Sequence, residues 1–277
     1  MQMQQRVDLH MHSCYSDGKL NPNQLIDLCA KAEMPIISIT DHDNVNGIEE
    51  AIAYGNQKGI QVIPGVEVST DFEGIEVHLL GYFFDYNNTH LKDFLNDIRL
   101  MRRKRNELIV SKLNEMGSKI SFVSIESKVS SQTTIGRPHI ANELNEEGFV
   151  NSYYDAFIKY IGDGKPAYVK KTNPDIREAV EQISEAGGLS FIAHPGKALR
   201  DDTLIRLINK GIDGLEVIHP SHSDDDIEYF TGIAADYFLL ICGGSDFHGG
   251  SKNDGKNFGK YSVTPVEVAN MKRRLFS

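Results

Sequence analysis

Short polar segments that carry histidine and acidic residues follow several apolar runs of this chain, and this arrangement limits the possible folds more than any other feature. Several of the runs are nearly continuous, which is typical of parallel strands buried on both faces. They cover residues 7–12, 36–40, 62–68, 77–83, 189–194, 215–219 and 238–242. Because amphipathic helical segments lie between them, the pattern predicts an α/β fold. It favours a barrel over an open sheet, although it does not determine closure.

One region, residues 90–169, interrupts this alternation. It contains no apolar run of strand type, and its apolar residues recur near helical spacing between positions 91 and 113. Segments 138–147 and 152–160 predict two further helices. We therefore expect two units, a barrel of residues 1–89 and 170–277 and a helical insertion of residues 90–169, which is placed to cap the barrel.

The composition is that of a folded protein and not of a disordered one. Of the 277 residues, 40% are hydrophobic and 25% are charged, which is enough apolar material to bury a core. The chain has 29 Lys+Arg against 39 Asp+Glu, a formal net charge of −10. This balance argues against binding duplex nucleic acid by bulk charge. A phosphate substrate remains compatible if bound metal ions reverse the local sign.

Sequence features also bear on location. No apolar run reaches the roughly 18 residues that a transmembrane helix requires. The first residues lack the apolar stretch of a signal peptide. The three cysteines, Cys14, Cys29 and Cys242, are odd in number and have no metal-type spacing. We therefore expect no disulfide framework, no membrane partner and a cytoplasmic protein.

The polar segments carry the residue types that bind metal ions. His10 and His12 are two residues apart on a predicted strand, so they share a face and can hold one ion. The other segments contain Asp17, Asp41-His42-Asp43, Glu67, His78, His194 and Asp246-Phe247-His248. Because the C-terminal ends of the strands in a parallel barrel open onto one face, we expect these side chains to meet there.

The number of these groups predicts more than one metal ion. Nine imidazoles and carboxylates exceed the needs of one or two four-coordinate ions, so we expect three divalent ions that share a bridging carboxylate. Imidazole and carboxylate without thiolate suit Mn, Fe or Zn. The candidate ligands are His10, His12, Asp17, His42, Glu67, His78, His194, Asp246 and His248.

The order of these segments, from position 10 to position 248, resembles that of the PHP family, the polymerase and histidinol phosphatase metallophosphoesterases. The resemblance implies a distorted (β/α)7 TIM-like barrel with a trinuclear centre. It implies three metal sites, held by His10, His12, Glu67 and Asp246, by Glu67, His78 and His194, and by Asp17, His42 and His248. Glu67, Asp246 and His194 are the expected catalytic residues among these ligands.

Arg137, His139 and His222 are the candidate substrate-binding residues. Pro138 suits the first turn of a helix, and a helix N-terminus beside a guanidinium can bind phosphate. The alternative for Arg137 is an ion pair within the insertion. His222 is expected to contact a phosphate or donate a proton, and His219 to lie behind the ligands. The basic run 102–105 is either a solvated helix face or an electrostatic guide for nucleotides.

These residues predict a metal-dependent phosphoesterase that hydrolyses phosphomonoesters of nucleotides. A water shared by two ions that Glu67 bridges would attack phosphorus, while the third ion and Arg137 neutralise the other oxygens. The segment Gly136-Arg137-Pro138-His139 is similar to that of the subgroup acting on nucleoside 3′,5′-bisphosphates and short RNA ends. The expected substrates are therefore a small phosphorylated nucleotide, such as adenosine 3′,5′-bisphosphate, and short single-stranded RNA.

Other functions remain open at this point. Within the family, the alternatives are a histidinol-phosphate phosphatase and a polymerase proofreading module. Outside it, a C–N hydrolase of the amidohydrolase type also begins with two histidines, but typically has a bridging lysine and a lone final aspartate. This chain has Glu67 and the pair Asp246 and His248 instead. A barrel without turnover is disfavoured because all nine ligand positions are filled.

Overall fold

The computed structural model describes residues 5–250 and 252–276 and contains one seven-stranded sheet, whose strand order follows the chain order from β1 to β7. The strands are β1 (Val7–Asp8), β2 (Ile36–Ile39), β3 (Gln61–Phe72), β4 (Ile75–Tyr82), β5 (Leu189–Ile192), β6 (Gly214–Ile218) and β7 (Leu240–Gly243). This arrangement confirms the predicted α/β class and the distorted TIM-like barrel.

One strand runs against the expected direction. β4 pairs antiparallel with both β3 and β5, whereas the other neighbouring strands pair in parallel. A two-residue turn with positive φ at Glu73 (55°) and Gly74 (85°) joins β3 to β4 as a hairpin. Because so short a turn cannot hold a crossover helix, the expectation that every strand brings its C-terminal end to one face is wrong for β4.

Backbone contacts between the segments that follow β1 and β7 nearly close the barrel. Leu9 N donates to Gly243 O at 3.2 Å, and Asp246 N donates to His10 O at 2.8 Å. Gly244 permits this approach because a Cβ there would lie only 2.4 Å from the backbone nitrogen of His10. The chain segments that carry His10 and Asp246 are thus held side by side.

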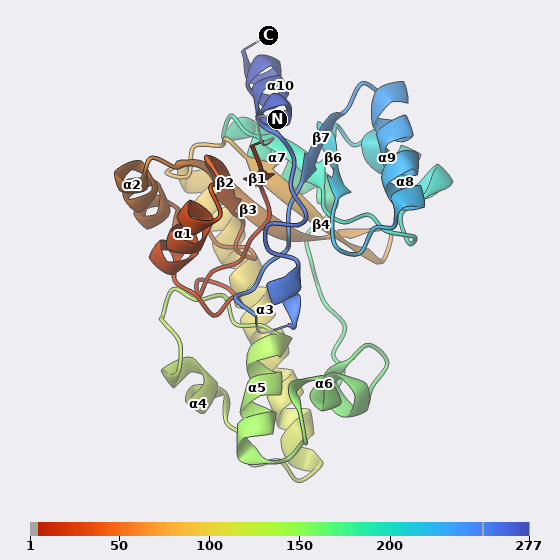
Figure 1. Cartoon of the computed structure of the whole chain (residues 1–277). Helices are drawn as coiled ribbons and strands as arrows, with labels where there is room; N and C mark the ends of the chain where they lie inside the picture. The colour runs from red at the N-terminus through yellow and green to blue at the C-terminus, as the bar shows by residue number, and fades with distance from the viewer. Residues whose placement is uncertain (1–4, 251, 277) are drawn as a thin grey trace.

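Helices lie around the outside of the sheet (Figure 1). They are α1 (Pro22–Lys31), α2 (Ile48–Lys58), α7 (Ile176–Glu185), α8 (Asp201–Ile208), α9 (Asp224–Asp236) and α10 (Pro265–Leu275), with a 3-10 turn, η2 (Asp254–Lys256). One core cluster joins Leu9, Tyr82 and Phe191 of the barrel to Met271 of α10. None of the described helices has both the length and the apolar character to cross a membrane.

Among the described residues, no strand lies between β4 and β5, as expected. The segment instead forms α3 (Thr89–Glu115), α4 (Phe122–Ser127), α5 (Arg137–Glu147), α6 (Tyr153–Ala156) and a π-helix, η1 (Phe157–Ile161). The helix predicted at 152–160 is therefore a single α-turn that continues as a π-helix.

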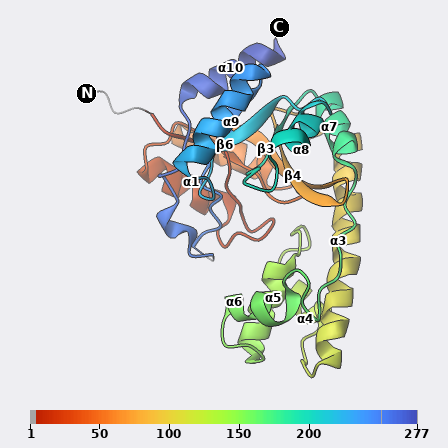
Figure 2. The same cartoon turned by 90° about the vertical axis from the view of Figure 1, so that its right-hand side faces the viewer.

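The long helix α3 runs from the barrel to the group formed by α4, α5 and α6 (Figures 1 and 2). This group packs around a core cluster of its own, which includes Leu113, Ile140 and Ile161. The division of the chain into a barrel and an insertion of residues 90–169 stays a prediction that this separate core supports.

Candidate metal centre

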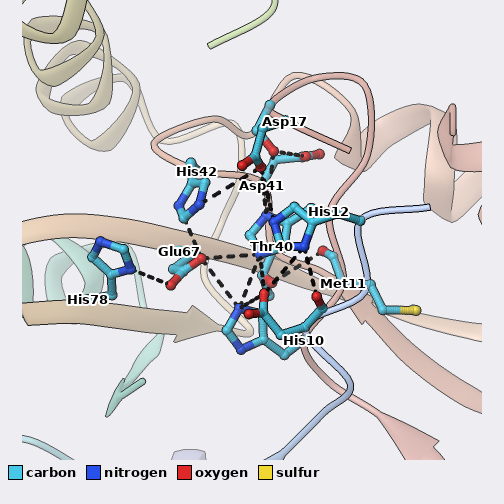
Figure 3. A network of polar contacts seen from close by, with 12 residues as sticks. His10, Met11, His12, Asp17, Thr40, Asp41, His42, Glu67 and His78 are labelled. Atoms are coloured by element: carbon cyan, nitrogen blue, oxygen red, sulfur yellow. Dashed lines mark hydrogen bonds and ion pairs between the residues drawn. The ribbon is translucent and has the colours of Figure 1, made fainter. Parts of the chain in front are cut away.

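The structure brings all nine predicted ligands into one contiguous cluster at the end of the barrel that faces the helical insertion. Overlapping sets of their ligand atoms lie within 4.8 Å of one another. Figure 3 labels part of the cluster, with Glu67 in the middle and the rings of His78 and His12 on opposite sides of it. The members are His10, His12, Asp17, His42, Glu67, His78, His194, Asp246 and His248.

The buried carboxylate of Glu67, on β3, is the centre of this cluster. Its Oε1 atom lies 2.7 Å from His78 Nδ1 and 3.0 Å from His194 Nε2. Its Oε2 atom lies near three more imidazole nitrogens, at 3.3 Å from His10 Nε2, 3.2 Å from His12 Nε2 and 3.1 Å from His42 Nδ1. A carboxylate whose two oxygens face different histidines has the geometry required of a bridging ligand.

Two further carboxylates lie on either side of Glu67. Asp246 Oδ1 is 3.2 Å from His12 Nε2 and 3.5 Å from His10 Nε2. On the other side, Asp17 Oδ1 is 3.2 Å from His248 Nε2. The three acids therefore divide the histidines into overlapping groups, each of which could surround a cation.

The antiparallel strand β4 delivers His78 from its middle rather than from its C-terminal end. In the hairpin register His78 lies opposite Ser69, two residues beyond Glu67 along β3. The second nitrogen of His78, Nε2, contacts Glu76 Oε1 at 2.9 Å. His78 therefore lies in the cluster as predicted, but it comes from the middle of an antiparallel strand and not from the C-terminal end of a parallel one.

Three buried polar atoms of the cluster test whether metal ions fit it. Asp17 Oδ1, His42 Nδ1 and His219 Nε2 each face an oppositely charged neighbour at 3.1–3.4 Å, but none of them makes an aligned hydrogen bond to a described residue. Buried polar groups normally make such bonds, so this close but unaligned packing is what a cation between the side chains would satisfy. Since the donors are imidazole and carboxylate without thiolate, the cluster fits ions such as Mn, Fe or Zn.

The charges in the cluster are strongly coupled. Burial opposes ionisation of Glu67, but the neighbouring His42, His78 and His10 hold the pKa of this carboxyl well below its usual range. Burial likewise opposes protonation of His78, yet the Glu67 carboxylate raises the pKa of His78 to about 9. In the protein alone, the neighbouring carboxylates raise the pKa of His10 and of His78 against the effect of burial, so protons on these two rings balance part of the negative charge, whereas burial lowers the pKa of His42. Metal ions would replace these protons, because a histidine ligand must be neutral.

Glu216, on β6, is a site residue that the sequence reasoning missed. It is completely buried, and its Oε1 accepts from His10 Nδ1 at 2.8 Å while its Oε2 accepts from the backbone nitrogen of His194 at 2.7 Å. A carboxylate on Nδ1 fixes the tautomer of His10 and turns Nε2 toward the cluster. The available signal was a lone acid between Leu215 and Val217 in an otherwise apolar strand.

The two aspartates that flank His42 support the site. Asp41 accepts hydrogen bonds from the Ser13 backbone and from Ser16 Oγ, which holds the loop that carries Asp17. Asp43 accepts from Ser69 N at 2.7 Å. Left-handed backbone at Asp43 (φ 52°) recurs at His194 (28°) and Asp246 (49°). Such uncommon conformations of non-glycine residues concentrate at functional sites.

A cavity of about 270 Å³ opens beside the cluster and reaches the helical insertion. Asp17, His42 and His78 line it on the barrel side. Cationic side chains make up much of the remaining wall, namely Arg102, Arg105, Arg137, Lys171 and Lys252. Lys252, which the sequence reasoning also missed, lies 2.9 Å from Asp17 Oδ2.

The three predicted substrate-binding residues do not all reach this cavity. Arg137 lines it and also pairs with Asp163 at 2.7 Å. His139 does not line it, and its Nδ1 accepts from Gly136 N at 3.1 Å. His222 does not line it either, and both of its ring nitrogens bond to the backbone, Nδ1 to Val217 O and Nε2 to Gly196 N. His219 comes closer than expected, with Nε2 at 3.4 Å from Asp246 Oδ2.

The basic run 102–105 divides between two environments. Arg103 is half exposed and pairs with Glu107 and Glu126. Arg102 and Arg105 instead turn inward and line the cavity. Of the two alternatives for this run, the solvated helix face therefore does not hold for these two arginines, because Arg102 donates to Asp43 of the barrel and Arg105 donates to the backbone oxygen of Val169.

Comparison with known proteins agrees with the geometry. The PHP domain family matches residues 8–191. A 3′,5′-nucleoside bisphosphate phosphatase of Chromobacterium violaceum is 36% identical over 247 residues, which cover 87% of this chain and 87% of that protein. A 5′-3′ exoribonuclease of Haemophilus influenzae is 33% identical over 252 residues, covering 89% of this chain and 91% of that protein.

A solved structure gives the same result for the fold. A proposed metal-dependent phosphoesterase of Bifidobacterium adolescentis superposes with a TM-score of 0.90 at 30% identity, covering 98% of this chain and 96% of that chain. The similarity therefore includes the barrel, the helical insertion and the ligand segments together. On these grounds the chain belongs to the PHP domain family.

Proposed function

We propose that this chain is a metal-dependent phosphoesterase that hydrolyses phosphomonoesters of nucleotides, with nucleoside 3′,5′-bisphosphates and the 5′ ends of short RNA as its substrates. The observation that carries the proposal is the Glu67 carboxylate, which five imidazoles surround beside a cavity that has cationic side chains in its wall. The names of the bisphosphate phosphatase and exoribonuclease relatives support the substrate class.

Three divalent ions of the Mn, Fe or Zn type are the proposed cofactors. They would be held by His10, His12, Glu67 and Asp246, by Glu67, His78 and His194, and by Asp17, His42 and His248. When bound, such ions supply an activated water and neutralise the oxygens of the phosphoryl group. Phosphomonoester hydrolysis is among the slowest uncatalysed reactions, which explains why so much positive charge is gathered at one point.

The side chains of this protein orient the ligands and the substrate. Glu216 directs His10 Nε2 into the cluster, and Glu67 joins the two sides of the centre. His194 and Asp246 retain 28% and 30% of their side-chain exposure, so a phosphoryl group can approach them from solvent. We assign catalytic roles to these two residues on this basis, to Glu67 because it lies between the two sets of histidines, and an electrostatic role toward the phosphate to Arg137.

The same geometry disfavours the alternative of a C–N hydrolase. The side chain in bridging position is the carboxylate of Glu67 rather than a lysine, and the last ligand segment contributes both Asp246 and His248. Histidinol phosphate stays the alternative substrate within the family. An experiment must separate it from nucleotides.

A substrate panel tests the proposal. Phosphate release is measured with Mn²⁺ for adenosine 3′,5′-bisphosphate, AMP, histidinol phosphate and a 5′-phosphorylated RNA pentamer, with and without a chelator. We expect metal-dependent turnover that is highest for the bisphosphate or the RNA, and its loss in Glu67→Gln. Turnover that persists in the chelator, or turnover of histidinol phosphate alone, would contradict the proposal.

A further inference from the structure

The segment between α4 and α5 reaches from the helical insertion to the barrel loop that carries Asp17 (Figure 1). The backbone nitrogen of Thr134 donates to Tyr15 O at 2.8 Å, and Thr133 Oγ1 donates to Cys14 O at 2.9 Å. Both acceptors lie within three residues of Asp17, which is one of the proposed metal ligands. Although the insertion is remote in sequence, it therefore holds part of this loop.

Asn44 joins the same segment to the barrel. Only 3% of the residue is exposed. Its Nδ2 donates both to Tyr15 O and to Gln132 O, each at 2.6 Å, and its Oδ1 accepts from Asn46 N at 3.0 Å. Because both donors and the oxygen of this amide are engaged, its orientation is fixed. One buried side chain thus links three parts of the chain, namely the turn before α2, the loop that carries Asp17, and the insertion.

Tyr15 O is the point at which the Asp17 loop depends on these contacts. Asp41 holds the residues on either side of it from the barrel, since this carboxylate accepts from Ser13 N and from Ser16 Oγ. Tyr15 O lies between these two residues and accepts instead from the asparagine amide and from the insertion. Loss of the latter bonds would leave the loop held on one side only.

The position of Asp17 is critical for a metal ion on this side of the cluster. Its Oδ1 lies 3.2 Å from His248 Nε2 and 3.9 Å from His42 Nε2, so the three side chains can surround one ion. Ligand atoms must come within about 0.2 Å of their ideal distance from the ion. A small shift of the loop would therefore weaken the binding of this ion. The ligands of the other two proposed ions do not include Asp17.

We propose that Asn44 is a positioning residue that clamps the helical insertion onto the Asp17 loop, and that this clamp sets the affinity of the proposed ion beside Asp17. This ion has Asp17, His42 and His248 as its proposed ligands. The clamp consists of the asparagine amide and the two threonine contacts to the loop. The inference rests on the proposed function, because it assumes that an ion binds at these ligands.

The clamp couples the insertion to the metal centre in both directions. If the insertion moves away from the barrel, the bonds that Tyr15 O accepts break, and the ion beside Asp17 binds more weakly. By linkage, the bound ion favours the docked position of the insertion to the same extent. Thr134 also lines the cavity beside the cluster, so docking of the insertion completes the wall of this cavity at the same time.

Amide hydrogen exchange on metal-free protein tests the clamp itself. Asn44→Ala removes the two hydrogen bonds that join the turn before α2 to the loop and to the insertion. The amide of Thr134, which donates to the loop, should therefore exchange about 10-fold or more faster than in the wild type. The amides of Ser16 and Gly18, which both donate to Ser13 O within the loop, should also exchange faster.

Asn106→Ala is the matched control. Asn106 is a completely buried asparagine on α3, and its Nδ2 donates to Ile135 O at 2.8 Å. Because this bond lies within the insertion, its loss should lower the free energy of unfolding but leave the exchange of the loop amides unchanged. If Asn44→Ala does not fold, Thr133→Val replaces it. This variant removes the bond to Cys14 O with almost no change of shape, so it should have an effect in the same direction.

Equilibrium dialysis against Mn²⁺ measures the effect on the ions. The wild type should bind three ions. Asn44→Ala should bind two of them as the wild type does and the third about 10-fold more weakly, as is typical when a partner behind a metal ligand is lost. Asp17→Asn should lose the same ion, and adding Asn44→Ala to it should not weaken the remaining two. Asn106→Ala should bind all three ions as tightly as the wild type.

The outcomes for the clamp and for the proposed function are distinct. Unchanged exchange of the loop amides or unchanged Mn²⁺ binding in Asn44→Ala would overturn the clamp, and so would an equal weakening of all three ions. A wild type that binds fewer than three ions would overturn it as well, while phosphate release in the substrate panel would still support the proposed function. Hydrolysis of none of the esters by the wild type would overturn the proposed function, whereas selective loss of one ion in Asn44→Ala would still support the clamp.

Discussion

Replacing Glu216 by glutamine tests how the barrel orients its metal ligands. The two carboxylate oxygens of Glu216 accept two hydrogen bonds, one from His10 Nδ1 at 2.8 Å and one from the His194 backbone at 2.7 Å. Glutamine offers one oxygen and one NH2 group, so it can accept only one of them. If the NH2 group faces His10, that ring must carry its proton on Nε2, where it can no longer bind a metal ion.

The magnitude follows from the bond that is lost. A hydrogen bond to a charged group contributes about 1.5–3 kcal/mol, which corresponds to roughly 10- to 150-fold in an equilibrium constant. Loss of a partner behind a metal ligand typically costs about 10- to 100-fold in metal affinity. We therefore expect Glu216→Gln to weaken Mn²⁺ binding by one to two orders of magnitude, although Glu216 itself does not face the cavity.

Competition with a fluorescent chelator measures this affinity. Asp213→Asn is the matched control, because Asp213 accepts from the Ser190 backbone at the opposite end of the strand pair β5 and β6. It should lower the free energy of unfolding without changing metal affinity. An Mn²⁺ affinity of Glu216→Gln equal to that of the wild type would refute the orienting role of Glu216.

Three further predictions concern charge, packing and a reassigned histidine. Because the pKa of Lys171 is lowered to about 8, this side chain loses its charge as the pH rises through 8. Calorimetry should therefore show weaker bisphosphate binding to metal-free protein at pH 9 than at pH 7, and Lys171→Arg should abolish the difference. Gly244→Ala should lower the free energy of unfolding in urea by about 1–3 kcal/mol, since its Cβ would meet His10 N, whereas Gly232→Ala, with open space around it, should not be destabilising. His222→Ala should lower the melting temperature, because both ring nitrogens of His222 bond to the backbone. It should not change the ratio of kcat/KM for adenosine 3′,5′-bisphosphate to kcat/KM for an aryl phosphate.

Most of the metal ligands could be predicted because they lie where a parallel strand ends at one rim of the barrel. His194 follows β5 closely, and Glu67 lies on β3 just beyond the residues Gln61–Pro64 that pair in parallel with β2. His78, in the middle of the antiparallel strand β4, is the exception.

The direction of β4 could not be predicted from its hydrophobic pattern, because a strand has the same pattern whichever way it runs. The local signal was the pair Glu73 and Gly74, which forms a hairpin turn. The burial of Arg105 depends on how α3 packs against the rest of the protein, and the burial of Glu216 depends on which face of β6 points inward. Both are tertiary facts, since a charged residue on a helix or strand is solvated unless a partner element covers it.

Anomalous diffraction from crystals loaded with Mn²⁺ would locate the ions themselves. The proposed centre predicts three peaks, two of which share the Glu67 carboxylate and one of which lies between Asp17, His42 and His248. An absence of peaks within coordination distance of Glu67, with manganese bound elsewhere or not at all, would contradict it.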